Sequence, residues 1–193
     1  MREFSSFPSS GTVERVFDRE LFRLRYRSAL RSTVYAMITV AAVSVLIAML
    51  ALPVLHIYGS SMSPTLKDGQ LVVAVKTSRF ATGDLVAFYH GNKILVKRCI
   101  AGPGQWVDMD EYGNIYVDGQ LLCEPYVNSK SHGETDIEYP YQVPDERWFM
   151  LGDHRDISVD SRSSQIGCVA QEQIIGRIIL RIWPLADFGT INT

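Results

Sequence analysis

The chain has 193 residues, of which 47% are hydrophobic and 21% charged, so it has room for one membrane segment and one modest folded domain. Residues 1–31 carry a net charge of +3, which leaves −5 for the rest of a chain whose total is −2. A mildly acidic folded part without a basic stripe argues against nucleic-acid binding.

Residues 1–31 are predicted to form a cytoplasmic tail followed by a basic helix. The first dozen residues are rich in serine, proline and glycine, which is typical of a disordered tail. Six arginines lie between Arg15 and Arg31, and the positive-inside rule therefore places this end of the chain in the cytoplasm. Apolar residues recur there at helical spacing, at Val13, Phe17, Leu21 and Leu24.

A long apolar segment follows, and we predict that it crosses a membrane over residues 32–56. Its centre, Thr33 to Leu55, has 23 residues without Asp, Glu, Lys or Arg. As a helix it would be about 35 Å long, enough for a hydrocarbon core of ~30 Å. A buried core helix is the alternative, but helices in small domains rarely reach this length without a polar face.

A cleavable signal peptide also begins with a basic stretch followed by an apolar one. The apolar stretch is too long for that role, and Leu52–Leu55 offers no small-x-small exit. An uncleaved signal anchor fits better, so we predict a single-pass protein of the cell membrane with residues 57–193 outside.

Residues 57–193 are predicted to form a β domain. Short apolar runs flank Gly91-Asn92 and Asp118-Gly119, two pairs that suit tight hairpins, and strands do not alternate with helices. The fold class is therefore mainly β, an antiparallel barrel or Greek-key-like domain after one transmembrane helix. The predicted strands include Leu71–Val75, Leu85–Tyr89, Ile94–Ala101, Ile115–Val117, Leu121–Leu122, Trp148–Leu151 and Ile174–Ile182.

Cysteine and histidine spacing indicates no metal site and no cofactor. Cys99, Cys123 and Cys168 lack a CxxC spacing, and small buried side chains are the favoured interpretation. A disulfide between two of them stays open. The four histidines show no HExxH or His-x-His spacing.

Three polar stretches stand out: Gly59–Leu66, Lys97–Gly104 and Gly152–Arg162. Each taken alone is typical of a turn or a solvated loop. A Ser-His-Asp triad could be drawn from His154 and Asp160, but the GxSxG motif is absent.

Lys97 shares its predicted strand face with Leu95, Cys99 and Ala101, so it points among apolar and small neighbours. Such burial lowers the pKa of a lysine, because it disfavours the charged form. A neutral lysine amine can act as general base for a serine hydroxyl, which is a weak nucleophile unassisted.

Together the three stretches resemble the bacterial type I signal peptidases, which are membrane-bound serine proteases with a Ser–Lys dyad. The resemblance covers roughly residues 30–185. Its motifs are Ser61–Leu66 (Ser-Met-x-Pro-Thr-Leu), Gly83–Val86, Lys97-Arg98, Pro103-Gly104, Glu124–Tyr126, Gly152–Arg162, Ile175–Arg177 and Trp183–Leu185.

The resemblance implies a peptidase that removes signal peptides from exported preproteins after a small-x-small motif. Ser61 would be the nucleophile, Lys97 its general base, and Ser158 would orient the lysine amine. The supporting residues would be an Asp160–Arg162 ion pair together with Asp153 and Arg155. Besides signal peptides, the lipid bilayer and the export translocon would be its partners.

The substrate is expected to bind as an added strand, with alternate side chains in pockets. This geometry explains a small-x-small requirement, because side chains two residues apart face the same wall. By resemblance, the substrate-binding residues would be Leu55, Ile57, Met62, Leu66, Leu95 and Val96.

The chain departs from the family pattern at four places. His154 stands where Asn is usual, and Ala101-Gly102 and Gln105 also differ. Gly59 stands where some members have a serine whose hydroxyl joins the oxyanion hole, which would then rest on backbone N–H groups, chiefly that of Ser61.

Two other functions stay open. The first is a catalytically silent relative that assists the assembly of surface fibres, although such proteins typically lack part of the dyad. The second is a dyad protease that cleaves itself, like the SOS-type repressors, but the membrane span counts against it.

Overall fold

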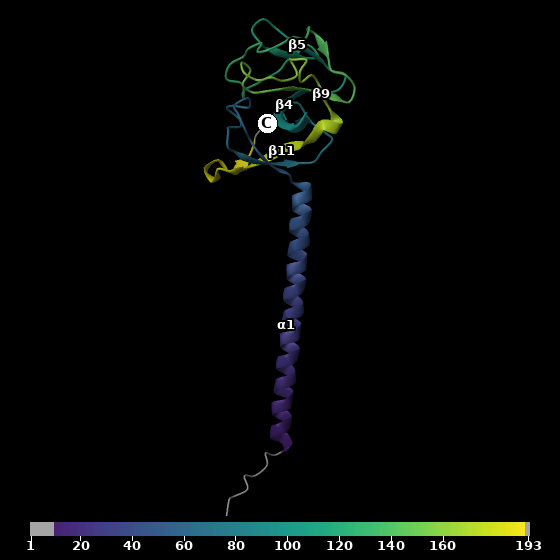
Figure 1. Cartoon of the computed structure of the whole chain (residues 1–193), viewed down its shortest axis with the longest axis vertical. Coiled ribbons are helices and arrows are strands. Elements are labelled where there is room, and N and C mark those ends of the chain that lie inside the picture. Colours follow the sequence, from purple (N-terminus) through teal and green to yellow (C-terminus); the bar gives the residue numbers. More distant parts are fainter. Residues whose placement is uncertain (1–9, 192–193) are drawn as a thin grey trace, which may run out of the picture. The chain divides into compact units, whose positions relative to one another are not determined.

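The structure, a computed structural model, describes residues 10–191, and it describes side chains for 26–47 and 52–191. The chain divides into two compact units, and the division falls between Leu50 and Ala51. The first is one long helix and the second is a β domain (Figure 1).

Helix α1 runs from Ser10 to Ala51. Its segment Tyr26–Ile47 is 22 residues long and apolar enough to cross a membrane, and none of its side chains is buried. Hydroxyl groups inside this segment donate to the carbonyl four residues earlier, at Thr33, Thr39 and Ser44. These bonds satisfy the hydroxyls within the helix, as a hydrocarbon environment requires.

The helix ends before the predicted boundary at residue 56. Pro53 follows it closely and has no N–H to continue the helical hydrogen bonds. The next residues, Val54–His56, form strand β1 instead of the end of the span. At the other end, residues 10–12, which composition predicted to be disordered, are helical, and residues 1–9 lie outside the described residues.

The larger sheet has the order β1-β2-β11-β3-β4-β9-β10, with β12 paired to β11, and all its pairs are antiparallel. The smaller sheet has the order β7-β6-β5-β8 and is also antiparallel. The bounds are β1 Val54–His56, β2 Leu71–Val75, β3 Leu85–His90, β4 Lys93–Ala101, β5 Trp106–Met109, β6 Ile115–Val117, β7 Gln120–Leu121, β8 Tyr141–Gln142, β9 Arg147–Leu151, β10 Val169–Ala170, β11 Ile174–Trp183 and β12 Gly189–Thr190, with 3₁₀ turns η1 Gln171–Gln173 and η2 Leu185–Asp187.

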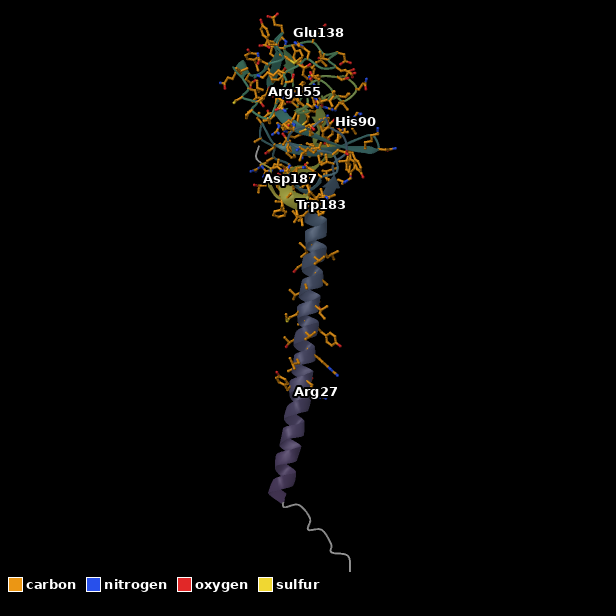
Figure 2. The ribbon with its side chains drawn as sticks, turned by 90° about the vertical axis from the view of Figure 1, so that its left-hand side faces the viewer. Arg27, His90, Glu138, Arg155, Trp183 and Asp187 are labelled. Carbon is orange, nitrogen blue, oxygen red and sulfur yellow. The ribbon has the colours of Figure 1, made fainter. Side chains whose placement is uncertain are left out.

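The predicted antiparallel β domain with one N-terminal apolar helix is confirmed. It consists of two sheets with open strand orders, however, rather than one closed barrel. Figure 1 shows β5 at one end of the domain and β11 at the other, with β4 and β9 between them. Figure 2 likewise shows Glu138 and Trp183 at opposite ends, with Arg155 between.

Strand β4 has neighbours on both sides for only part of its length. Strand β3 pairs with it from Lys93 to Arg98, whereas β9 pairs with it only from Arg98 to Ala101. Within the described residues, the first half of β4 therefore has one unpaired edge. Strand β1 ends the sheet and is likewise paired on one side only, with β2.

Candidate active site

The loop between β1 and β2, residues 58–69, carries Ser61 and is called the serine loop here. Two backbone hydrogen bonds join the two ends of this loop. Ile57 N–H donates to Gln70 O at 2.8 Å, and Gly69 N–H donates to Ile57 O at 2.9 Å. Its buried side chains Met62 and Leu66 pack into the core under the sheet. Ser61, which directly precedes Met62, is half-buried.

Gly59 and Asp68 make a second closure of the serine loop. The Gly59 N–H donates to Asp68 Oδ1 at 2.7 Å. Gly59 has φ +83°, a left-handed conformation that favours glycine over residues with a Cβ. A serine at this position would be strained, which gives a physical reason for this departure from the family pattern.

Lys97 lies on β4 and is only 3% exposed. Its Nζ donates to Ser158 Oγ at 2.7 Å. Burial lowers the pKa of Lys97 to about 8; the Asp160 carboxylate opposes this shift, Arg162 adds to it and Asp153 opposes it. The lysine therefore lies in the desolvated setting that its strand position predicted.

Gly152 lies between Ser61 and Ser158. A Cβ at residue 152 would lie 2.1 Å from Ser158 Oγ and 2.7 Å from the Ser61 carbonyl oxygen, so no larger residue fits. The next turn adds a direct link, because His154 N–H donates to Ser61 O at 3.0 Å. The loop that carries Ser158 is thus packed against the serine loop, and Ser158 in turn bonds Lys97.

No hydrogen bond joins Ser61 Oγ to Lys97 Nζ among the residues that the structure describes; the amine donates to Ser158 instead. Catalytic hydrogen bonds are often long without substrate and tighten when it binds. Lys97 and Ser158 are therefore hydrogen-bonded, and the Ser61 backbone lies near Ser158 across Gly152.

Asp160 and Arg162 form a buried ion pair, with Nε–Oδ1 at 2.8 Å and Nη2–Oδ2 at 2.9 Å. Asp160 also accepts the Gly152 N–H at 3.0 Å. The remaining Arg162 donors bond the backbone carbonyls of Arg155, Ser158, Ser131 and His132. The pair fixes the backbone around Ser158 and Gly152 rather than touching Ser61.

Arg98 ties three separate segments together. Its guanidinium binds Asp153 through two bonds of 2.9 and 2.6 Å, and Thr65 of the serine loop donates to the same carboxylate at 2.5 Å. Arg98 also donates to Gly83 O at 2.7 Å and lies 3.7 Å from the ring centroid of Tyr126. Asp153 thus links β4 to the serine loop, which is a more specific place than the loop-shaping role that the resemblance implied.

Arg155, the remaining predicted supporting residue, is fully buried and pairs with Glu124. Its Nε donates to Gly152 O at 2.9 Å. The sequence motifs included Arg98, Thr65, Glu124 and Tyr126, but no roles were assigned to them. Buried charges need partners, yet a single sequence does not say which distant residue each one meets.

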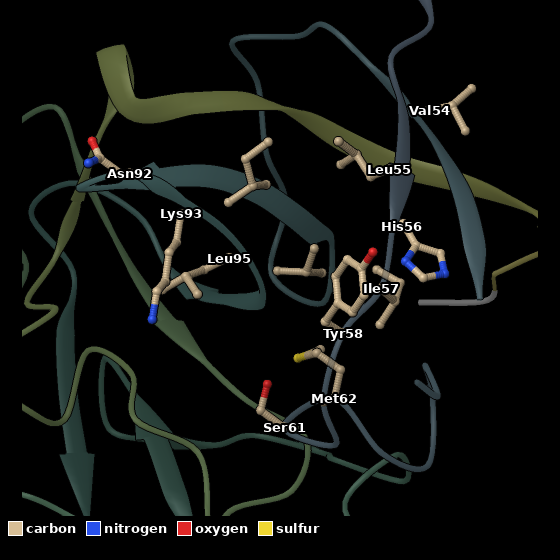
Figure 3. A pocket seen from close by; sticks show the side chains of 13 residues that line it. Val54, Leu55, His56, Ile57, Tyr58, Ser61, Met62, Asn92, Lys93 and Leu95 are labelled. Carbon is tan, nitrogen blue, oxygen red and sulfur yellow. The ribbon is translucent and has the colours of Figure 1, made fainter. Parts of the chain in front are cut away.

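A groove of about 640 Å³ opens beside Ser61. Figure 3 shows Val54 to Tyr58 on one side of it, Asn92, Lys93 and Leu95 on the other, and Ser61 with Met62 below. Five of the six predicted substrate-binding residues line it: Leu55, Ile57, Met62, Leu95 and Val96. Leu66 does not line it, because it is fully buried in the core under the serine loop.

The described part of the chain contains no disulfide bond and no candidate metal site. Cys99, Cys123 and Cys168 are all free, with Cys123 exposed and the other two buried. Burial raises the pKa of the Cys99 thiol to about 12. The described His, Cys, Asp and Glu residues form no group of three or more that could hold a metal ion.

Comparison with known proteins finds relatives that are all described as signal peptidases. A family model described as "Signal peptidase, peptidase S26" matches residues 30–183. Signal peptidase IB of Staphylococcus aureus (strain COL) is 38% identical over 155 residues, covering 68% of this chain and 78% of the relative. The probable signal peptidase I-2 of Synechocystis sp. is 32% identical over 150 residues, covering 71% and 66%.

Among solved structures, a signal peptidase I from Enterococcus faecalis V583 aligns with a TM-score of 0.44 and 25% identity. The alignment covers 51% of this chain and 96% of that one.

Proposed function

Because the chain belongs to the signal peptidase family, peptidase S26, we propose that it is a serine endopeptidase that removes signal peptides from exported preproteins. The observation that carries the proposal is the buried Lys97, whose lowered pKa leaves part of its amine neutral near neutral pH. A silent assembly factor is not favoured, because the dyad and its supporting residues are all present.

In the proposed mechanism, Ser61 Oγ attacks the carbonyl carbon at the cut and Lys97 takes its proton. The same amine then protonates the departing amino group, and a water molecule hydrolyses the acyl-enzyme. Ser158 holds the lysine amine in place through their hydrogen bond. The proposal requires a movement that brings the amine into hydrogen-bonding distance of the Ser61 hydroxyl when substrate excludes water.

The oxyanion would be stabilised by backbone N–H groups of the serine loop. The Gly59 N–H is already bonded to Asp68, so it is not available. The Ser61 N–H bonds no other group in the described part of the chain and is the donor that we propose.

The peptide is proposed to bind as an added strand in the groove between β1 and the unpaired edge of β4. Cys99 directs both its N–H and its C=O toward β3, to Asp84 O and Gly83 N. Backbone groups alternate along a strand. Ile94 and Val96 therefore turn theirs toward the free edge, where they would pair with the peptide.

The membrane topology is part of the same proposal. We infer that the apolar part of α1 spans the bilayer, that residues 1–31 lie in the cytoplasm and that the β domain lies outside. The arginines between Arg15 and Arg31 support this orientation. A peptidase held there would meet preproteins as they leave the export translocon, which we infer to be its neighbour.

The test is cleavage of a purified preprotein with an Ala-x-Ala site by the full chain in detergent micelles. Wild type is expected to cut after the second alanine, as mass spectrometry of both products will show. Ser61→Ala and Lys97→Ala should each lose roughly a thousandfold or more in rate. Lys97→Arg should be equally inactive, because a guanidinium does not become neutral.

Ser60→Ala is the matched control, because it removes the neighbouring exposed hydroxyl of the same loop and should keep activity. Activity lost in Ser60→Ala and kept in Ser61→Ala would reverse the assignment of the nucleophile. Activity kept in both lysine variants would exclude the lysine base.

A further inference from the structure

The groove beside Ser61 carries a cation on one wall. Among the described residues that line it, Lys93 is the one lysine or arginine, and none is an aspartate or glutamate. The Lys93 side chain is exposed and forms no ion pair or hydrogen bond with any described residue. Most other lining residues are apolar, among them Leu55, Ile57 and Leu95, so an unpaired charge at this place is available to a ligand.

The position of Lys93 along the groove is fixed by the β3–β4 hairpin. Lys93 is the first residue of β4 and pairs with His90 across the turn at Gly91. It precedes Lys97 by four residues on the same strand face, a distance of about 13 Å along an extended chain. The Cα atom of Lys93 is therefore held at a set distance from that of Lys97, and its exposed side chain extends from that point.

This inference rests on the proposed function. The half of the substrate that precedes the cut stays attached to Ser61 in the acyl-enzyme, and the groove extends from Ser61 along β4 toward Asn92. That half then runs parallel to β4. Its residue at the cut lies beside Lys97, the third residue before the cut beside Leu95, and the fifth beside Lys93.

We propose that Lys93 is a specificity-determining residue that reads the fifth residue before the cut. It favours a side chain with an oxygen acceptor there, above all a carboxylate, and disfavours a lysine or arginine. The two small residues near the cut meet apolar walls, whereas this more distant residue meets a positive charge. The chemical class selected is thus an extended peptide with an acidic or amide side chain four residues upstream of the small residue at the cut.

The expected effect is modest, because Lys93 is exposed. Exposed ion pairs change an equilibrium by a few-fold, and repulsion between like charges has a similar size. Lys93 should attract a peptide with an acidic fifth residue and repel one with a basic fifth residue. Together these effects should make kcat/KM about fivefold higher for the acidic peptide. Salt screens such pairs, so the separation should shrink at high ionic strength.

The experiment uses three peptides that are identical except for Ala, Glu or Lys at the fifth residue before the cut. With the full chain in an uncharged detergent at low salt, wild type should prefer the Glu peptide over the Lys peptide about fivefold. Lys93→Glu should invert the preference and Lys93→Met should bring the ratio close to one. The control Lys130→Glu makes the same charge change on an exposed lysine that bonds Asn114, far along the chain, and should keep the wild-type ratio.

Binding of the same labelled peptides to Ser61→Ala separates this inference from the proposed function. If the peptides bind in the expected order of affinity, Glu over Ala over Lys, but wild type does not cleave them, the proposed function is overturned and the role of Lys93 is kept. Suppose instead that all three proteins, wild type, Lys93→Glu and Lys130→Glu, cut at the expected bond with the same ratio of kcat/KM for the Glu and Lys peptides. That result would keep the proposed function and overturn the role of Lys93. Peptides that do not bind at all would overturn the role of Lys93.

Discussion

At the scale of single residues, the protonation of Lys97 decides when the enzyme works. Burial lowers its pKa to about 8. We therefore predict that kcat/KM rises as the pH increases through about 8, since only the neutral amine accepts the serine proton. At pH 7 roughly one molecule in ten has the neutral form. Initial rates at pH 6 to 9.5 test this, and a flat profile would contradict a lysine base.

The same pKa shift has a consequence for stability. The folded-state pKa lies below the unfolded value of about 10.4, so burying the charged lysine costs free energy at pH below about 8. This cost disappears as the pH rises toward the unfolded pKa. Lys97→Met should therefore raise the free energy of unfolding at pH 7 more than at pH 9.5. Urea titrations at both pH values measure the difference.

The burial of Lys97 could be predicted from the sequence, because strand alternation places it beside Leu95 and Cys99. The contact with Ser158 was implied only by the family resemblance, since the two residues are 61 positions apart and no local pattern joins them. The same limit applies to Arg98 and Asp153, 55 positions apart. The sequence motifs include Arg98 and Asp153, and the fold shows that they are partners.

At the scale of elements, Arg98 joins β4 to the serine loop through Asp153 and Thr65. Arg98→Ala would leave the Asp153 carboxylate buried without its charged partner, which costs about 3–5 kcal/mol. Thr65→Val removes one donor to that carboxylate and should cost about 1–3 kcal/mol.

Urea unfolding of the full chain in micelles measures both losses. Lys76→Ala serves as the control, because Lys76 is exposed and forms no ion pair with any described residue. An Arg98→Ala variant as stable as Lys76→Ala would mean that the buried pair does not hold these elements together.

Strand β1 lies within residues 32–56, which the sequence predicts as the membrane span. Leu52 to Leu55 is apolar, and such a run fits the end of a membrane helix as well as a short strand. The outcome depends on pairing with β2, which brings Val54 opposite Val73 and His56 opposite Leu71. The hairpin at Asp118-Gly119, by contrast, was predictable, because both residues adopt the positive φ that such turns require.

At the scale of the whole molecule, the class of the fold followed from the sequence and the arrangement of strands did not. Frequent turn signals predicted antiparallel strands, and the structure has them. Strand β11, however, lies between β2 and β3, which precede it by about a hundred residues. Pairing over such a distance is set by the packing of the whole domain, so two open sheets could not be told from one barrel.

The topology gives a prediction for intact cells. Cys123 is exposed, whereas Cys99 and Cys168 are buried, so a membrane-impermeant maleimide should label one cysteine. Labelling is expected without permeabilisation, because the β domain is proposed to lie outside. A Ser10→Cys, Cys123→Ser variant should be labelled only after permeabilisation. The opposite pattern for the two proteins would invert the proposed orientation.

The unpaired edge of β4 bears on how many different proteins one such enzyme serves. Recognition there depends mainly on main-chain N–H and C=O groups, which almost every residue supplies. The groove should therefore accept many different peptide sequences, and the side chains of the peptide need to be small only where they meet its walls. Proline is the exception, because it has no N–H to offer Ile94 or Val96, and a preprotein with proline at a paired position should escape processing.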